Sequence, residues 1–108
     1  MKYHSQKTEV DNITFDSKKE AKRYTELKLL QRTGIISNLK LQPRYELQPS
    51  FKKHDKTYRK IEYVGDFEYQ MNGETIVEDV KGFKTEAYKL KKKLFEFKYR
   101  DKEIKEIK

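Results

Sequence analysis

The sequence predicts an α/β domain in which a central mixed β-sheet is flanked by two α-helices. Two segments with helical spacing of apolar residues lie on either side of a long stretch in which apolar and polar residues alternate. An Asn-Gly pair inside that stretch is a strong signal for a β-hairpin. The chain has 108 residues, and we expect residues 1–108 to form one domain with one modest core.

The N-terminal part predicts a short hairpin followed by a helix. Residues 8–10 and 13–15 are candidate strands joined by a tight two-residue turn. Ser17 and Glu20 have the spacing of a capping box, which is typical of the first turn of a helix. Apolar residues then follow at three-residue steps, at Ala21, Tyr24, Leu27 and Leu30. Gly34 favours the end of this helix.

The next part of the chain predicts a strand and a basic loop. Residues 45–48 are the candidate strand, because a proline precedes and follows them and proline cannot donate to a ladder. Residues 51–60 are predicted to form a loop that carries Lys52, Lys53, Lys56, Arg59 and Lys60. This loop either contacts phosphates or is simply solvated, and the sequence alone leaves both interpretations open.

The hairpin signal at Asn72-Gly73 also predicts a register. Residues 61–70 and 75–81 alternate with period two on either side of it. A symmetric loop centred on this pair joins residues whose numbers sum to 145. One face of the hairpin is then largely apolar and is expected to line the core, with Tyr63, Phe67, Tyr69, Ile76 and Val80.

The other face of the same hairpin carries the candidate site. Asp66 is predicted to lie opposite Asp79, and Lys81 shares their face because it is two residues further on. Two carboxylates about 5 Å apart repel by on the order of 3 kcal/mol, which a divalent cation would offset. Alternatively both aspartates are exposed and Lys81 neutralises them at the surface. Glu78 is a competing carboxylate, but the register points it to the opposite face.

The C-terminal part predicts a second helix and a closing strand. Residues 84–100 carry the helix, and its apolar stripe is Ala87, Leu90, Leu94 and Phe97. Residues 103–107 are the closing strand. The candidate contacts to a phosphate backbone are Lys84, Lys89 and Lys92 on the helix and Arg59 in the basic loop, although outward-facing lysines are often only solvated.

Composition narrows the classes of function. Lys and Arg number 26 against 18 Asp and Glu, and the resulting net charge of +8 favours a polyanionic partner such as nucleic acid. The absence of cysteine excludes disulfides and thiol nucleophiles, so a metal would need oxygen or histidine ligands. No segment approaches the roughly 20 apolar residues of a membrane span, and we expect an intracellular protein without a membrane partner.

The order of these features resembles the PD-(D/E)xK nuclease superfamily. In that superfamily a glutamate on a helix is followed by an aspartate on a strand. The adjacent strand then carries an acidic residue, any one residue and a lysine, and a helix follows. The matching positions here are Glu20, Asp66, Asp79-Val80-Lys81 and the helix that follows. More narrowly, residues 15–24, 36–49 and 77–95 resemble a phage and prophage family known as a domain of unknown function and assigned to this superfamily.

This resemblance implies a restriction-endonuclease-like core and a metal-dependent DNA endonuclease that hydrolyses phosphodiester bonds. Mg²⁺ or Mn²⁺ would be bound by Asp66, Asp79, the backbone carbonyl of Val80 and Glu20, while Lys81 would assist the attacking water. Glu20 has an alternative role as a helix cap alone.

The implied setting is DNA processing in the cytoplasm of a bacterial or phage-infected cell, with selectivity for DNA structure such as the junctions of phage recombination. A homodimer is an expected assembly, because resolving a four-way junction needs two active sites. The alternative function is a basic DNA-binding protein that retains the nuclease fold without cutting.

Overall fold

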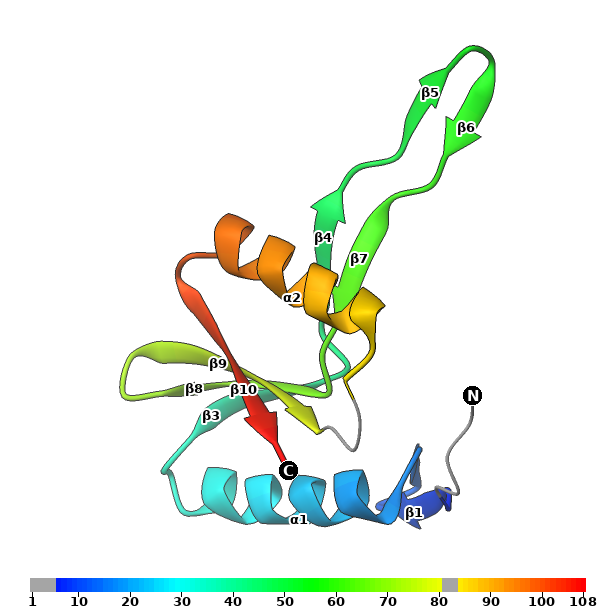
Figure 1. Ribbon diagram of the computed structural model, residues 1–108. Helices are drawn as coiled ribbons and strands as arrows, with labels where there is room; N and C mark the ends of the chain where they lie inside the picture. The colour runs from blue at the N-terminus through cyan, green and yellow to red at the C-terminus, as the bar shows by residue number, and fades with distance from the viewer. Residues whose placement is uncertain (1–5, 81–83) are drawn as a thin grey trace.

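The computed structural model describes residues 6–80 and 84–108, and these form a mixed α/β fold. Its largest sheet has four strands in the order β10-β9-β8-β3. β3 (Ser37–Leu41) and β8 (Phe67–Met71) are antiparallel, as are β8 and β9 (Glu74–Val80), whereas β10 (Lys102–Ile107) runs parallel to β9. The sheet is therefore mixed, as predicted, and it lies between the two helices (Figure 1).

The remaining strands form three separate antiparallel pairs. β1 (Thr8–Val10) pairs with β2 (Ile13–Phe15), as the sequence predicted. β4 (Arg44–Gln48) pairs with β7 (Ile61–Val64), and β5 (Phe51–Lys53) pairs with β6 (Lys56–Tyr58). The expected single central sheet is thus replaced by several sheets. The expected basic loop at residues 51–60 is largely a two-stranded ladder.

Helix α1 (Lys18–Arg32) begins and packs as predicted. The hydroxyl oxygen of Ser17 accepts a hydrogen bond from the backbone N–H of Glu20 at 3.1 Å, which caps the first turn. Gly34 follows the helix with a φ of 86°, a conformation that glycine adopts without strain. The buried face of the helix carries Ala21, Tyr24 and Leu27.

Helix α2 (Glu86–Lys98) exists as predicted, but the predicted apolar stripe is wrong. Leu90, Leu94 and Phe97 are 59%, 39% and 70% exposed, and Ala87 is also exposed. The buried side chains of the helix are Tyr88 and Phe95. These aromatic residues are seven positions apart, or about two helical turns, and they define a neighbouring face that packs against β4, β7 and β10.

The predicted hairpin register is confirmed between β8 and β9. Phe67 pairs with Glu78 and Met71 pairs with Glu74, so the residue numbers sum to 145 throughout. The predicted continuous strand 61–70, however, breaks after β7. Gly65 lies at the break, and a Cβ atom there would sit 2.8 Å from a methyl carbon of Val77, so close packing requires glycine.

The break moves Tyr63 away from its predicted face. Phe67, Tyr69 and Ile76 line a core beneath α1, as predicted, and Val80 packs against it. Tyr63 instead joins a second core on the α2 side of the sheet, because it belongs to the β4–β7 pair. The members of that second core are Tyr45, Tyr63, Val77, Tyr88, Phe95 and Ile104. The expected one modest core is therefore two clusters on opposite faces of one sheet.

Candidate functional site

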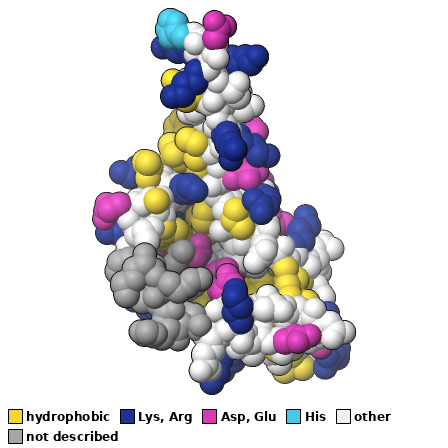
Figure 2. Space-filling model, turned by 90° about the vertical axis from the view of Figure 1, so that its right-hand side faces the viewer, with side chains coloured by type: hydrophobic (Ala, Val, Ile, Leu, Met, Phe, Trp, Pro, Cys, Tyr) yellow, Lys and Arg dark blue, Asp and Glu magenta, His cyan; other side chains and the backbone are white. Residues whose placement is uncertain are grey.

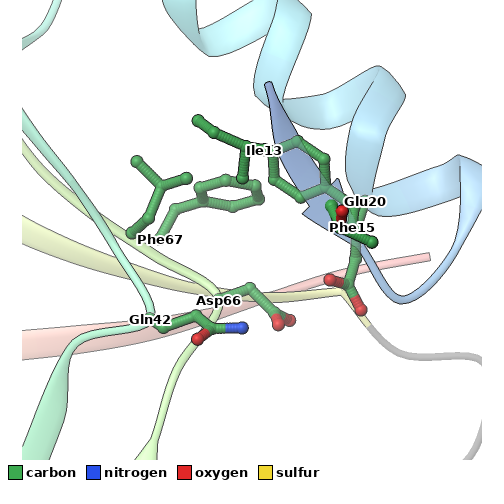
Figure 3. Close-up of a pocket in the computed structure, with 8 residues that line it drawn as sticks. Ile13, Phe15, Glu20, Gln42, Asp66 and Phe67 are labelled. Atoms are coloured by element: carbon green, nitrogen blue, oxygen red, sulfur yellow. The ribbon is translucent and has the colours of Figure 1, made fainter. Parts of the chain in front are cut away.

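A pocket of about 130 Å³ opens between the start of α1 and the break before β8. Its apolar wall includes Ile13, Phe15 and Phe67. Glu20 and Asp66 also line it, and their carboxylates point toward one another from α1 and from the β7–β8 break (Figure 3). Figure 2 shows acidic side chains at the bottom of a hollow on this side of the molecule. The structure thus brings together two of the predicted site residues.

Asp66 is fixed at the point where the ladder between β8 and β9 ends. Its backbone N–H donates to the carbonyl of Glu78 at 2.9 Å. Its carboxylate oxygen Oδ2 accepts from the backbone N–H of Val80 at 2.6 Å. The side chain therefore occupies a position that a backbone carbonyl fills in a regular ladder, and it lies against the peptide that joins Asp79 to Val80.

Asp79 is only 3% exposed and lies on the α2 face of β9. The hydroxyl of Tyr63 donates to its carboxylate oxygen Oδ2 at 2.5 Å. Burial and this hydrogen bond both raise the pKa of Tyr63, which keeps the hydroxyl protonated as a donor. The interpretation of Asp79 as an exposed surface carboxylate is therefore wrong.

Glu78 points to the opposite face, as the register predicted, and is fully buried. The guanidinium of Arg23 donates to its two carboxylate oxygens, from Nε at 2.7 Å and from Nη2 at 2.6 Å. The hydroxyl of Tyr69 donates a third bond at 2.5 Å. The pKa of Arg23 is raised, chiefly by the hydrogen bonds to Glu78. Glu78 and Arg23 thus form a closed ion pair that holds α1 to the sheet.

Sequence reasoning missed Arg23 as the partner of Glu78, because 55 residues separate the two. The available signal was a lone charge on an otherwise apolar strand face, which requires a buried counter-charge. Lys81, the fourth predicted catalytic residue, lies outside the described residues. Val80, whose carbonyl was a predicted metal ligand, is the last described residue of β9.

The oxygen atoms at this site fit a hard divalent cation. Mg²⁺ in proteins commonly takes one or two carboxylates and fills its other positions with water and phosphate oxygens. Glu20 and Asp66 supply two converging carboxylates beside open space. Within residues 6–80 and 84–108, no three acidic or histidine side chains lie close enough together to hold a metal ion by themselves.

Two of the predicted phosphate contacts, Lys84 just before α2 and Lys92 on it, have a partner on the sheet. Lys84 lies 2.9 Å and Lys92 3.2 Å from the carboxylate of Glu106 on β10. The hydroxyl of Tyr88 donates to the same carboxylate at 2.7 Å. These groups, Lys84 first, lower the pKa of Glu106 to about 2. Both lysines therefore help to attach α2 to the sheet.

The other two predicted phosphate contacts lie further out. Lys89 forms an exposed pair with Glu86 one turn earlier on α2, at 3.2 Å. Arg59 is exposed in the segment between β6 and β7.

The fold and the pocket define a mixed α/β protein with a small acidic site at the edge of its main sheet. The chain belongs to the family described as a protein of unknown function (DUF1064), whose match covers residues 1–108. The part of the predicted resemblance that concerned a domain of unknown function is therefore confirmed. No curated protein and no solved structure matches the chain. In its described residues, neither helix is long and apolar enough to cross a membrane.

Proposed function

We propose that this protein is a metal-dependent DNA endonuclease that hydrolyses phosphodiester bonds. The observation that carries the proposal is the convergence of the Glu20 and Asp66 carboxylates in one open pocket (Figure 3). Two converging carboxylates beside solvent supply oxygen ligands of the kind that a hard divalent cation takes in proteins. The net charge of +8 supports a polyanionic substrate.

In this proposal Glu20 and Asp66 would hold Mg²⁺ or Mn²⁺ in the pocket. Asp79 and the carbonyl oxygen of Val80, the other ligands that the resemblance implies, would join them only once the ion is bound, because no three acidic side chains of the described residues are close enough beforehand. The bound ion would activate water and stabilise the charge that develops on the phosphate. The hydrogen bond from Val80 orients the Asp66 carboxylate, and the hydroxyl of Tyr63 orients Asp79. Lys81, two residues beyond Asp79, assists the attacking water or stabilises the developing negative charge.

The proposal extends to membership of the PD-(D/E)xK superfamily with a restriction-endonuclease-like core. It is supported by the order of the elements around the site. Glu20 lies in the first turn of α1, Asp66 precedes β8, Asp79 lies on β9, and α2 follows. A mixed sheet with one helix on each face agrees with such a core. Selectivity for branched DNA and a homodimeric assembly remain predictions.

Cleavage of labelled DNA duplex, flap and four-way junction tests the proposal. The wild type is compared with Glu20→Gln, Asp66→Asn and Asp79→Asn, each with Mg²⁺, Mn²⁺ or excess chelator. We expect cutting that requires the metal and falls by about 100-fold or more in each variant. Glu26→Gln is the matched control, because Glu26 lies on the same helix as Glu20 but outside the pocket.

Two results would count against the proposal. Full cutting by Asp66→Asn would show that the pocket is not the active site, provided that circular dichroism confirms folding of every variant. Binding of all three DNA substrates without cutting by the wild type, in any metal, would favour the alternative of a DNA-binding protein without catalysis.

A further inference from the structure

Residues 51–60 form an arm that projects from the rest of the molecule. β5 and β6 pair with each other in a sheet of their own, and every residue from 51 to 60 is exposed. Figure 1 shows the arm extending beyond the β4–β7 pair, away from the main sheet and both helices. The arm therefore contributes little to the core, and its sequence is free to serve another purpose.

The arm keeps a defined shape without support from the body. His54 and Asp55 at its tip have φ values of 53° and 61°, as in the tight turn that matches the twist of a two-stranded ladder. The rings of Phe51 and Tyr58 stack across the ladder, with centroids 4.8 Å apart and planes inclined by 9°. Such a cross-strand aromatic pair stabilises a ladder that has no core of its own.

The two lysines beside the tip of the arm, Lys53 and Lys56, have no counter-charge among the described residues. Lys53 pairs directly with Lys56 across the ladder, an arrangement of like charges that destabilises it. Neither of these lysines forms an ion pair with any residue of the described chain, and Asp55 is the arm's single acidic residue. By contrast, Lys60 at the base of the arm pairs with Glu62 at 3.2 Å. An anionic partner would relieve the repulsion toward the tip.

We propose that this arm is a second DNA-contacting element, which lies in the major groove of duplex DNA and neutralises its phosphates. The major groove, about 12 Å wide, admits a two-stranded β-ribbon, and the phosphates on either side supply the missing negative charge. The inference rests on the proposed function, because it takes DNA as the partner. On one face of the molecule, Lys and Arg side chains extend along the arm toward the acidic hollow (Figure 2).

The arrangement has a consequence for the substrate. The molecule measures 53 × 36 × 23 Å along its principal axes, and the arm lies at one end of its long dimension (Figure 1). A substrate that occupies the pocket and also contacts the arm must therefore be double-stranded well beyond the phosphate that is cut. A short single strand would reach the pocket alone.

The test measures binding of a fluorescent DNA duplex in excess chelator, so that no cutting occurs. The double variant K53Q/K56Q is compared with the wild type over a series of salt concentrations. We expect about tenfold weaker binding, and a plot of log affinity against log salt concentration whose slope is smaller by about 2. The control K28Q/R32Q removes the same charge from the end of α1 and should keep the slope of the wild type.

The outcomes separate this inference from the proposed function. An unchanged slope and affinity in K53Q/K56Q would overturn the role of the arm, even if the wild type cuts DNA. An equal loss in both double variants would also overturn it, because binding would then follow net charge alone. A reduced slope only in K53Q/K56Q would establish the arm, even if the wild type proves unable to cut.

Discussion

The two faces of the four-stranded sheet hold their helices in different ways. On the α1 face an apolar core surrounds one closed ion pair, in which Arg23 and Tyr69 bind Glu78. The α2 face instead has a layer of tyrosine hydroxyls that donate to carboxylates on β8, β9 and β10 of the main sheet. The three pairs are Tyr45 with Glu68, Tyr63 with Asp79, and Tyr88 with Glu106.

Because of this difference, the neighbouring carboxylates of Glu78 and Asp79 have different roles. Glu78 accepts three strong hydrogen bonds and is fully buried, which suits a group that fixes α1 on the sheet. Asp79 binds a neutral hydroxyl and lies one peptide bond from the amide that orients Asp66. Glu78 therefore serves stability on the α1 face, while Asp79 on the α2 face lies next to the peptide that orients Asp66 in the pocket at the start of α1.

The largest effect is expected where the closed ion pair is broken. Arg23→Met leaves the Glu78 carboxylate buried without its counter-charge, and we expect the free energy of unfolding to fall by about 3–5 kcal/mol. Urea denaturation followed by circular dichroism measures this. Arg32→Met, at the exposed end of the same helix, is the control and should change the free energy by less than about 0.5 kcal/mol. A similar small loss in both variants would contradict the assignment of Glu78 as a structural group.

The two helices should also differ in how they tolerate the loss of a leucine. Leu27 on α1 is fully buried, and we expect Leu27→Ala to lower the free energy of unfolding by about 2–5 kcal/mol. Leu90 on α2 is 59% exposed, and Leu90→Ala should cost less than about 0.5 kcal/mol. The same urea experiment compares the two. Equal losses would show that Leu90 is covered in solution and that the exposed stripe of α2 is occupied by another surface.

Local sequence signals predicted both helices and two of the hairpins. The capping box at Ser17 located the start of α1, and Asn72-Gly73 fixed the register of β8 and β9. Both are short-range effects, in which a side chain or a turn geometry acts within a few residues. The same holds for the hairpin of β1 and β2.

Features that depend on distant contacts were missed. The break at Gly65 follows from the close approach of Val77, and nothing near Gly65 in the sequence reveals it. Helix α2 has two faces with helical spacing of apolar or aromatic residues. The predicted aliphatic face is exposed, because the aromatic rings of Tyr88 and Phe95 on the other face fill the space under the helix. Tertiary packing decided between faces that periodicity could not distinguish.

The candidate site was predictable in part for the same reason. The register placed Glu78 and Asp79 on opposite faces, which the structure bears out. The approach of Glu20 to Asp66 depends on how α1 packs on the sheet, and only the resemblance to a family supplied it before the structure did. The hydroxyl of Tyr63 was not foreseen at all, because the break before β8 turns this side chain toward Asp79.

The smallest expected change in the free energy of unfolding concerns Glu106 on the α2 face. Its carboxylate pairs with Lys84 and Lys92 and accepts a hydrogen bond from the hydroxyl of Tyr88. Its pKa in the folded protein is lowered from 4.5 to about 2, so its contribution is complete above pH 4.5 and is lost as the pH falls toward 2. Because both lysines are partly exposed, we expect about 1–2 kcal/mol.

Urea denaturation of the wild type and of Glu106→Gln at pH 7 and pH 3 measures this contribution. The variant should be less stable at pH 7, and most of its deficit should disappear at pH 3, where the wild type has lost much of the same interaction. A deficit of equal size at both pH values would mean that the contacts of Glu106 act through packing. The α2 face would then be held by packing, in contrast to the charge-dependent ion pair of the α1 face.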